Sequence, residues 1–309
     1  MDFWLQQEPI RARTGLVCLW RRSITSGRQI TRQGRGVTFQ DDPGEDGAPS
    51  LPQRILCDTA ACVRFFSRMP VPRLSACDDP AALPDFSAIA WAIPIAGVII
   101  ALPAALAGVV LGLTHLPFLA VGLIVTGLLA AVTGALHEDG LADIADGFFG
   151  GATVERRLAI MKDSQIGSFG ALALIFLFGL KSVLIATLLE RLGPVPAMAI
   201  LLGGEALSRT LMAWQWSVLP PARPGGLGHR FGCPDQAAVV LASLAALVFL
   251  VPSAFLLPLP ALSLGLLLAY SAAYATGRLA KAKIGGFTGD VLGAVQQVSG
   301  LVFLICITA

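Results

Sequence analysis

The densest group of side chains that could carry out chemistry lies in a short acidic segment, residues 137–147. On a continuous helix, Asp139, Asp143 and Asp146 project within about 60° of one another. Three carboxylates on one face repel each other, and a divalent cation removes that repulsion. Mg²⁺ is commonly held by one or two carboxylates together with the phosphates of a substrate. The spacing therefore favours a Mg²⁺ site over an ordinary solvated helix end, with His137 roughly 160° away as a hydrogen-bonding or substrate-contacting residue.

Basic and hydroxyl side chains follow the acidic segment. Arg156, Arg157 and Lys162 could hold phosphates, because arginine offers a planar fork of donors and lysine a point charge. Asp163 and Ser164 come next, and Asp163 could complete the metal site or act as a base. The alternative is that these basic residues only mark the cytoplasmic side of a membrane. Taken together, acids and bases at this spacing predict metal-assisted phosphoryl-group transfer.

Two glycine-rich segments, residues 224–230 and 283–290, resemble ligand-binding loops. Neither matches a Walker A loop, which requires GxxxxGK[ST] between a strand and a helix. Each segment alone is a weak signal. We expect both to lie on the same side of the protein as the acidic segment.

The composition indicates a membrane protein. Hydrophobic residues make up 55% of the 309 positions and charged residues 14%, and the mean hydropathy is +0.73. A soluble domain carries about 25% charged residues. A net charge of +2 gives no indication of nucleic-acid binding. The six cysteines form no CxxC pair, which argues against a zinc site or a disulfide framework.

Apolar runs of roughly twenty residues, long enough to cross a bilayer, predict an all-α polytopic membrane protein with about seven spans. The loops at 114–117 and 257–260 contain no Lys or Arg, whereas those at 137–167, 217–236 and 278–290 do. The positive-inside rule therefore places the N-terminus and the basic loops in the cytoplasm. The expected spans are 91–113, 118–136, 168–189, 195–216, 237–257, 260–280 and 290–308.

Charged residues inside predicted spans need a cavity or a partner. Glu205 is a candidate partner for Lys181 on the preceding span. Arg209 lies nearer the cytoplasmic end of its span, where it either serves the site or extends to the surface.

The N-terminal part differs from the rest of the chain. Residues 1–53 predict a disordered tail or an extension from an upstream start codon. Residues 54–309 predict a single integral-membrane transferase domain. Within it, residues 54–68 present one apolar face, which predicts a helix at the membrane surface that ends before Pro70.

Five motifs follow one another along the chain: FFSRMPVPR at 65–73, HEDGLADIADG at 137–147, IMKDS at 160–164 with Gly167, Ser208-Arg209, and GGFTGD at 285–290 followed by Leu292-Gly293-Ala294. In this order they resemble the cobalamin synthase family, the adenosylcobinamide-GDP ribazoletransferases. The likeness covers about residues 54–309. Glu138 stands where that family often has an apolar residue, and Gln297 and Gly300 stand in a stretch where it often has acids.

The resemblance implies the last assembly step of adenosylcobalamin. The hydroxyl of α-ribazole, or of its 5′-phosphate, attacks the corrinoid-proximal phosphorus of adenosylcobinamide-GDP, and GMP leaves. It also implies a Mg²⁺ requirement and a multi-pass protein of the cell inner membrane, with other late cobalamin-assembly enzymes as candidate partners and no nucleic acid. The implied residues are Lys162, Asp163 and Arg209 for catalysis, Asp139, Asp143 and Asp146 for metal, and His137, Arg156, Ser164, Ser208, Gly286, Thr288 and Asp290 for substrate.

Two other functions stay open at this point. A transporter of a corrinoid or a cation would use Lys181 and Glu205, although transporters place their sites near the midplane and often contain repeats. A CDP-alcohol-type lipid phosphotransferase is suggested by Asp143-x-x-Asp146-Gly147, which echoes the start of that signature. Uptake into sealed vesicles without covalent change would identify the first, and release of CMP from a CDP-lipid the second.

Overall fold

The computed structural model describes residues 50–75, 78–223 and 225–309, and the structural statements below concern these residues. They form helices throughout, as expected, and the described part contains no β-strand. The expectation for residues 1–53 falls almost entirely outside it. The helices are α1 Leu51–Phe66, α2 Phe86–Ile89, the 3₁₀ helix η1 Ala90–Ala92, α3 Ile93–Gly112, α4 Phe118–Thr133, α5 Leu136–Gly150, α6 Val154–Ile160, α7 Ser168–Leu192, α8 Pro194–Val218, α9 Leu227–Phe231, α10 Gln236–Leu256, α11 Leu259–Ile284 and α12 Gly289–Thr308.

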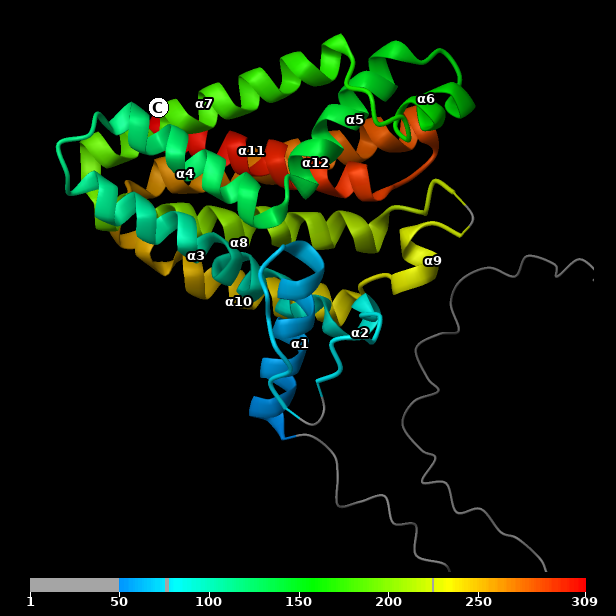
Figure 1. Ribbon diagram of the computed structural model, residues 1–309, viewed down its shortest axis with the longest axis horizontal. Coiled ribbons are helices and arrows are strands. Elements are labelled where there is room, and N and C mark those ends of the chain that lie inside the picture. Colours follow the sequence, from blue (N-terminus) through cyan, green and yellow to red (C-terminus); the bar gives the residue numbers. More distant parts are fainter. Residues whose placement is uncertain (1–49, 76–77, 224) are drawn as a thin grey trace, which may run out of the picture. The chain divides into compact units, whose positions relative to one another are not determined.

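The long helices lie side by side, with α5, α6 and α9 gathered at one end (Figure 1). Leucine, valine and phenylalanine side chains point outward along α3, α4, α7, α10 and α11, as expected for helices surrounded by lipid. Five described helical stretches are long and apolar enough to cross a membrane, and α4 with α5 counts as a sixth if that bent pair is one span. The chain is therefore a multi-pass membrane protein. The predictions of about seven spans and a cytoplasmic N-terminus stay predictions.

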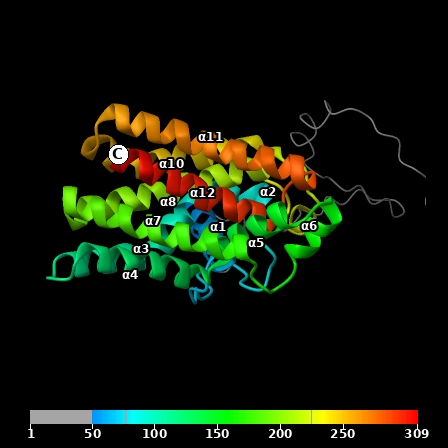
Figure 2. The same cartoon turned by 90° about the horizontal axis from the view of Figure 1, so that it is seen from above.

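Helix α8 is not among the five apolar stretches, because charged and polar side chains such as Glu205 and Arg209 lower its hydropathy. It is 25 residues long and packs against α3, α10 and α12 (Figure 2). Most of its side chains are buried, including Trp216 and Arg209. Polar groups can lie at membrane depth here because neighbouring helices, rather than lipid, surround them.

The second expected span is wrong at its C-terminal end. Helix α4 stops at Thr133, and α5 leaves it at an angle of 91°. Gly134 and Ala135 both adopt left-handed conformations, with φ of 66° and 59°. Ala135 is the only non-glycine residue with positive φ in the described part, and such a conformation is disfavoured for a residue with a Cβ. The acidic segment is thus a helix of its own, from Leu136 to Gly150.

Helix α1 runs across the long helices (Figure 1). It occupies 51–66 rather than the expected 54–68, because Ser50 and Gln53 form a capping box that starts the helix earlier. Phe65 packs edge-to-face against Phe86, and Phe66 packs against the same ring at a tilt, which anchors α1 to α2. Its placement at the membrane surface stays a prediction.

The connection after α1 is held by one ion pair. Arg64 donates from both terminal nitrogens to Asp78 at 2.7 Å, from Nε to the carbonyl oxygen of Val71 and from Nη2 to that of Pro72. The Arg64 guanidinium also holds the pKa of Asp78 below its usual range. These bonds hold residues 71 and 72, within the motif at 65–73, against helix α1.

Candidate active site

The acidic helix α5 and the segment after α6 enclose a pocket of about 280 Å³. Asp139 and Asp143 line it from α5, and Lys162, Asp163 and Ser164 line it from the segment that leads into α7. Asp143 is half-buried, while the other four side chains are exposed. The two motifs that sequence reasoning singled out separately therefore face the same space. A pocket lined by carboxylates, an ammonium group and a hydroxyl can bind a phosphate-bearing substrate together with a cation.

Glycines bring a further carboxylate to this site. A Cβ on Gly140 of α5 would lie 2.8 Å from the backbone of Asp290 at the start of α12, and one on Gly293 would lie 3.0 Å from the Cα of His137. The two helices therefore touch backbone to backbone. As a result, the charge of Asp290 acts on Asp143, as do the charges of Asp139 and Asp146. Asp290 had been expected only to bind substrate.

Asp146 faces a different neighbour. Its two carboxylate oxygens accept hydrogen bonds from the backbone N–H of Gly167 at 2.7 Å and of Gly170 at 2.9 Å, at the N-terminus of α7. A Cβ on either glycine would come within 2.4 Å of this carboxylate. Asp146 thus caps α7, and its negative charge interacts favourably with the positive end of the helix dipole. In the described part of the chain, no three His, Cys, Asp or Glu side chains are arranged to hold one metal ion.

Two arginines fix α6 next to the pocket. Arg157 donates to the carbonyl oxygens of Gly151 at 2.9 Å, Ala152 at 3.1 Å and Lys283 at 2.9 Å. Arg223 donates to the carbonyl oxygen of Leu158 at 2.6 Å. These bonds hold a helix that buries none of its own side chains.

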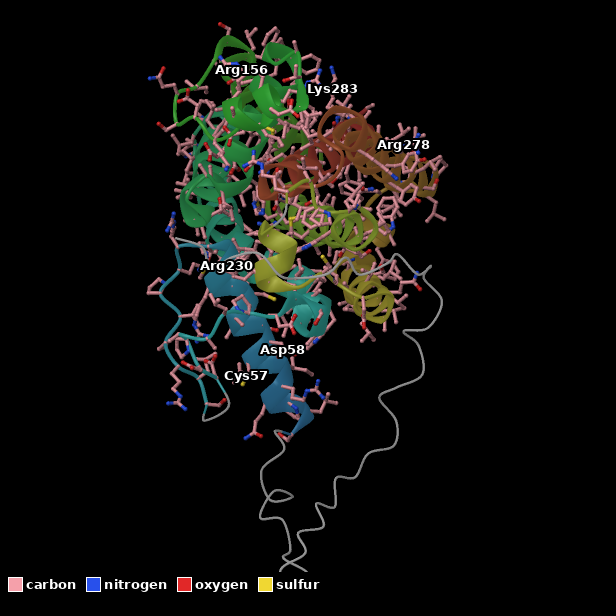
Figure 3. All side chains as sticks on the ribbon, turned by 90° about the vertical axis from the view of Figure 1, so that its right-hand side faces the viewer. Cys57, Asp58, Arg156, Arg230, Arg278 and Lys283 are labelled. Carbon is pink, nitrogen blue, oxygen red and sulfur yellow. The ribbon has the colours of Figure 1, made fainter. Side chains whose placement is uncertain are left out.

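The exposed basic residues gather at the same end of the long helices. Arg156 is exposed on α6, Arg230 on α9 and Arg278 on α11, and Figure 3 shows them at this end together with the half-buried Lys283. No described hydrogen bond occupies the guanidinium of Arg156, so it is available to a ligand.

The second glycine-rich segment meets residues 220–222, just before the first one, near the start of α12. Phe287 N–H donates to the carbonyl oxygen of Pro220 at 2.8 Å, and Ala222 N–H donates to that of Phe287 at 2.9 Å. Thr288 caps α12 by accepting from the Val291 N–H, and its hydroxyl donates to Asp290 Oδ2 at 3.0 Å. Thr288 thereby orients the Asp290 carboxylate. Gly286 and Thr288 act here by shaping the chain around Asp290.

This contact gives a steric prediction. A Cβ on Gly286 would lie 2.0 Å from the Pro220 carbonyl oxygen, whereas one on Gly289 meets nothing within 4 Å. We expect Gly286→Ala to force the two segments apart, at a cost of about 1–3 kcal/mol in stability. Activity should fall about tenfold, because Asp290 moves with this segment. Gly289→Ala is the matched control and should leave the apparent Tm in detergent and the rate unchanged; equal effects of both variants would contradict the argument.

A second polar cluster is fully buried between α7, α8 and α12. Lys181 Nζ lies 3.1 Å from Glu205 Oε1, which confirms the predicted partner, and Arg209 pairs with the other oxygen of Glu205. Gln296 Nε2 donates to Glu205 at 3.3 Å and to Ser208 Oγ at 3.1 Å. Arg209 is 2% exposed and so does not extend to the surface. Neither Arg209 nor Ser208 lines the pocket.

His137 lies between these two groups. It is buried, its ring stacks against Phe66 at 6.0 Å, and the charges of Arg209, Glu205 and Lys181 act on it. Its Nε2 has no hydrogen-bond partner in the described part of the chain. Sequence reasoning missed Arg223 and Gln296 as contributors to the site. The only signal for Gln296 was a polar residue within an apolar span.

Known proteins resemble the chain over nearly all of the described region. Residues 58–308 match the profile of the family described as cobalamin-5-phosphate synthase. A Brucella anthropi protein named adenosylcobinamide-GDP ribazoletransferase is 45% identical over 257 residues, covering 81% of this chain and 95% of that protein. Proteins of the same name from Brucella canis and Brucella suis are each 44% identical over 256 residues, covering 81% of this chain and 96% of theirs. No solved structure matches the chain.

Proposed function

Because this chain belongs to the cobalamin-5-phosphate synthase family, we propose that it joins adenosylcobinamide-GDP to α-ribazole, or to α-ribazole 5′-phosphate, and releases GMP. The product is adenosylcobalamin or its 5′-phosphate. The observation that supports this most directly is the pocket shared by Asp139, Asp143, Lys162, Asp163 and Ser164. It brings together the groups that a pyrophosphate substrate and an attacking hydroxyl require.

The reaction exchanges one bond to phosphorus for another. The ribazole hydroxyl oxygen bonds to the corrinoid-proximal phosphorus, the bond from that phosphorus to the oxygen of GMP breaks, and the hydroxyl proton must leave. Asp163 is exposed within the pocket, and its Oδ1 accepts the Gln165 N–H at 3.1 Å, which fixes the carboxylate. We assign it as the base that takes this proton. Lys162 beside it neutralises charge on the departing GMP phosphate.

The donor set fits Mg²⁺. Asp139 and Asp143 line the pocket, and the charge of Asp290 acts on both. Mg²⁺ needs only one or two protein carboxylates when substrate phosphates complete its shell. We assign Asp139 and Asp143 as its ligands, with Asp290 beside them. When bound, the ion neutralises charge on the reacting pyrophosphate.

Arg209 and Ser208 support the site from a distance in this proposal, because they lie in the buried cluster rather than in the pocket. Arg156 is the exposed guanidinium nearest in sequence to the pocket segment, and we assign it to the guanosine diphosphate part of the substrate. His137 holds α5 through its ring contact with Phe66.

We place the protein in the cell inner membrane, with the pocket and basic loops facing the cytoplasm. The basic residues on and near α6, α9 and α11 support this orientation. The substrates then reach the pocket from the side on which nucleotides are present. Other late cobalamin-assembly enzymes are the partners we expect there.

A transporter is less well supported, because Lys181 and Glu205 are paired with each other and buried beside Arg209. A lipid phosphotransferase would instead use a CDP-lipid as donor.

The direct test is GMP release. Purified protein in detergent, given adenosylcobinamide-GDP, α-ribazole and Mg²⁺, should form GMP and a joined corrinoid in equal amounts. Omission of α-ribazole should abolish GMP release, which separates joining from hydrolysis. CMP release from a CDP-lipid, or corrinoid uptake by sealed vesicles without GMP formation, would overturn the proposal.

A further inference from the structure

The contact between α5 and α12 contains one buried polar pair. Gln297 Nε2 donates a hydrogen bond of 2.8 Å to Glu138 Oε1, although the two residues are 159 positions apart. Glu138 is 5% exposed and Gln297 4%. Glu138 is the residue before Asp139, which lines the acidic pocket, but Glu138 and Gln297 do not line it themselves.

The backbone contacts around this pair bring the two helices close together. Gly140 meets the backbone of Asp290, and Gly293 meets the backbone of His137, because neither glycine has a side chain. A hydrogen bond to a charged oxygen is roughly twice as strong as one between neutral groups, and it depends on direction. The pair therefore adds a directional contact to the two close glycine contacts in the observed register of α5 on α12.

Register matters here because the pocket carboxylates lie on the same helix. A slip of one helical turn would move Asp139 and Asp143 by about 5.4 Å relative to Asp290. Glu138 does not line the pocket, so any effect that it has on the reaction is exerted through its neighbours.

We infer that Glu138 and Gln297 form a positioning pair that, together with the contacts at Gly140 and Gly293, sets the register of α5 against α12 and holds Asp139 and Asp143 opposite Asp290. This inference rests on the proposed role of these carboxylates. Glu138 Oε2 and Gln297 Oε1 have no hydrogen-bond partner in the described residues. The bond between Gln297 Nε2 and Glu138 Oε1 is therefore the one side-chain hydrogen bond that the described residues show for this pair.

An exchange of the two residues provides the test. Gln297→Glu alone places two carboxyl groups in contact in a buried site, where like charges repel. We expect it to lower kcat for GMP release about 100-fold and to raise the Mg²⁺ concentration needed for half-maximal rate. Adding Glu138→Gln restores an amide-to-carboxylate bond in the reverse direction. The double variant should recover to within about tenfold of the wild-type kcat, with its Mg²⁺ requirement restored.

A buried polar pair elsewhere serves as the matched control. Ser182 Oγ and Thr126 Oγ1 lie 3.2 Å apart between α7 and α4 and do not line the pocket. Ser182→Ala should lower the apparent Tm in detergent without changing KM or the Mg²⁺ requirement. If Gln297→Glu does not fold, Gln297→Leu is measured instead, and it should lower kcat about tenfold at a loss of Tm similar to that of Ser182→Ala.

A double variant as inactive as Gln297→Glu, or single variants with wild-type kcat and Mg²⁺ dependence, would overturn the inference. If the wild-type protein releases no GMP, the proposed function has failed instead. In that case thermal unfolding tests the pairing of Glu138 with Gln297. The double variant must then have a higher apparent Tm than Gln297→Glu, close to that of the wild type.

Discussion

Asp143→Asn is expected to lower kcat for GMP release about 10³-fold while leaving the protein folded. Asp143 is the half-buried carboxylate of the pocket, and the charges of Asp290, Asp139 and Asp146 act on it. Stabilisation of a reacting phosphate by a held cation contributes several kcal/mol, and each 1.36 kcal/mol corresponds to a tenfold change in rate. Removing one charge from a repelling group should not lower stability. Initial rates across a Mg²⁺ titration, with the apparent Tm in detergent, measure both effects.

Asp146→Asn is the informative comparison, because it changes the same residue type one helical turn away. Asp146 accepts two backbone N–H groups of α7, and an amide has only one oxygen to offer them. Loss of such a cap costs about 0.5–2 kcal/mol. We therefore expect a lower Tm with an unchanged Mg²⁺ requirement. If Asp146→Asn raises the Mg²⁺ requirement as Asp143→Asn does, Asp146 is a ligand and our assignment is wrong.

The contrast between these two aspartates shows what the sequence could predict. Helical spacing put Asp139, Asp143 and Asp146 on one face, and the structure keeps them on one helix. Spacing cannot report what stands opposite each side chain, however. Asp146 faces the start of α7, and Asp143 faces the pocket.

Other features were beyond sequence reasoning because they depend on local strain or on distant contacts. The apolar sequence through Gly134 and Ala135 predicts one continuous span. The 91° bend between α4 and α5 arises where both residues adopt the left-handed conformation. The approach of Asp290 to α5 depends on two glycines in different motifs. By contrast, Lys181 and Glu205 could be paired in advance, because an isolated charge in an apolar span has few available partners.

The bond between Glu138 and Gln297 could not be predicted either. The sequence shows Glu138 where the family often has an apolar residue and Gln297 in a stretch where acids are common. Nothing in the sequence connects the two positions. In the structure the two side chains form one hydrogen bond.

Glu205→Gln is expected to be the most destabilising single substitution in the buried cluster. Glu205 is the only described carboxylate paired with Lys181 and Arg209, and all three side chains are at most 6% exposed. Removing one partner of a buried ion pair costs about 3–5 kcal/mol, because the other charge is left uncompensated. Here two cations would be left at once. We expect a fall of about 10 °C in the apparent Tm in detergent.

Lys181→Met should have a much smaller effect than Glu205→Gln, although it breaks the same ion pair. After this change Glu205 still pairs with Arg209 and still accepts from Gln296, so the cluster goes from one excess positive charge to none. A hydrophobic side chain of similar volume in place of a buried charge is often neutral or stabilising. Comparing the apparent Tm of the two variants separates the effect of losing one ion pair from the effect of leaving a buried charge without a partner. A larger loss of Tm for Lys181→Met than for Glu205→Gln would show that Lys181, rather than Glu205, holds the cluster together.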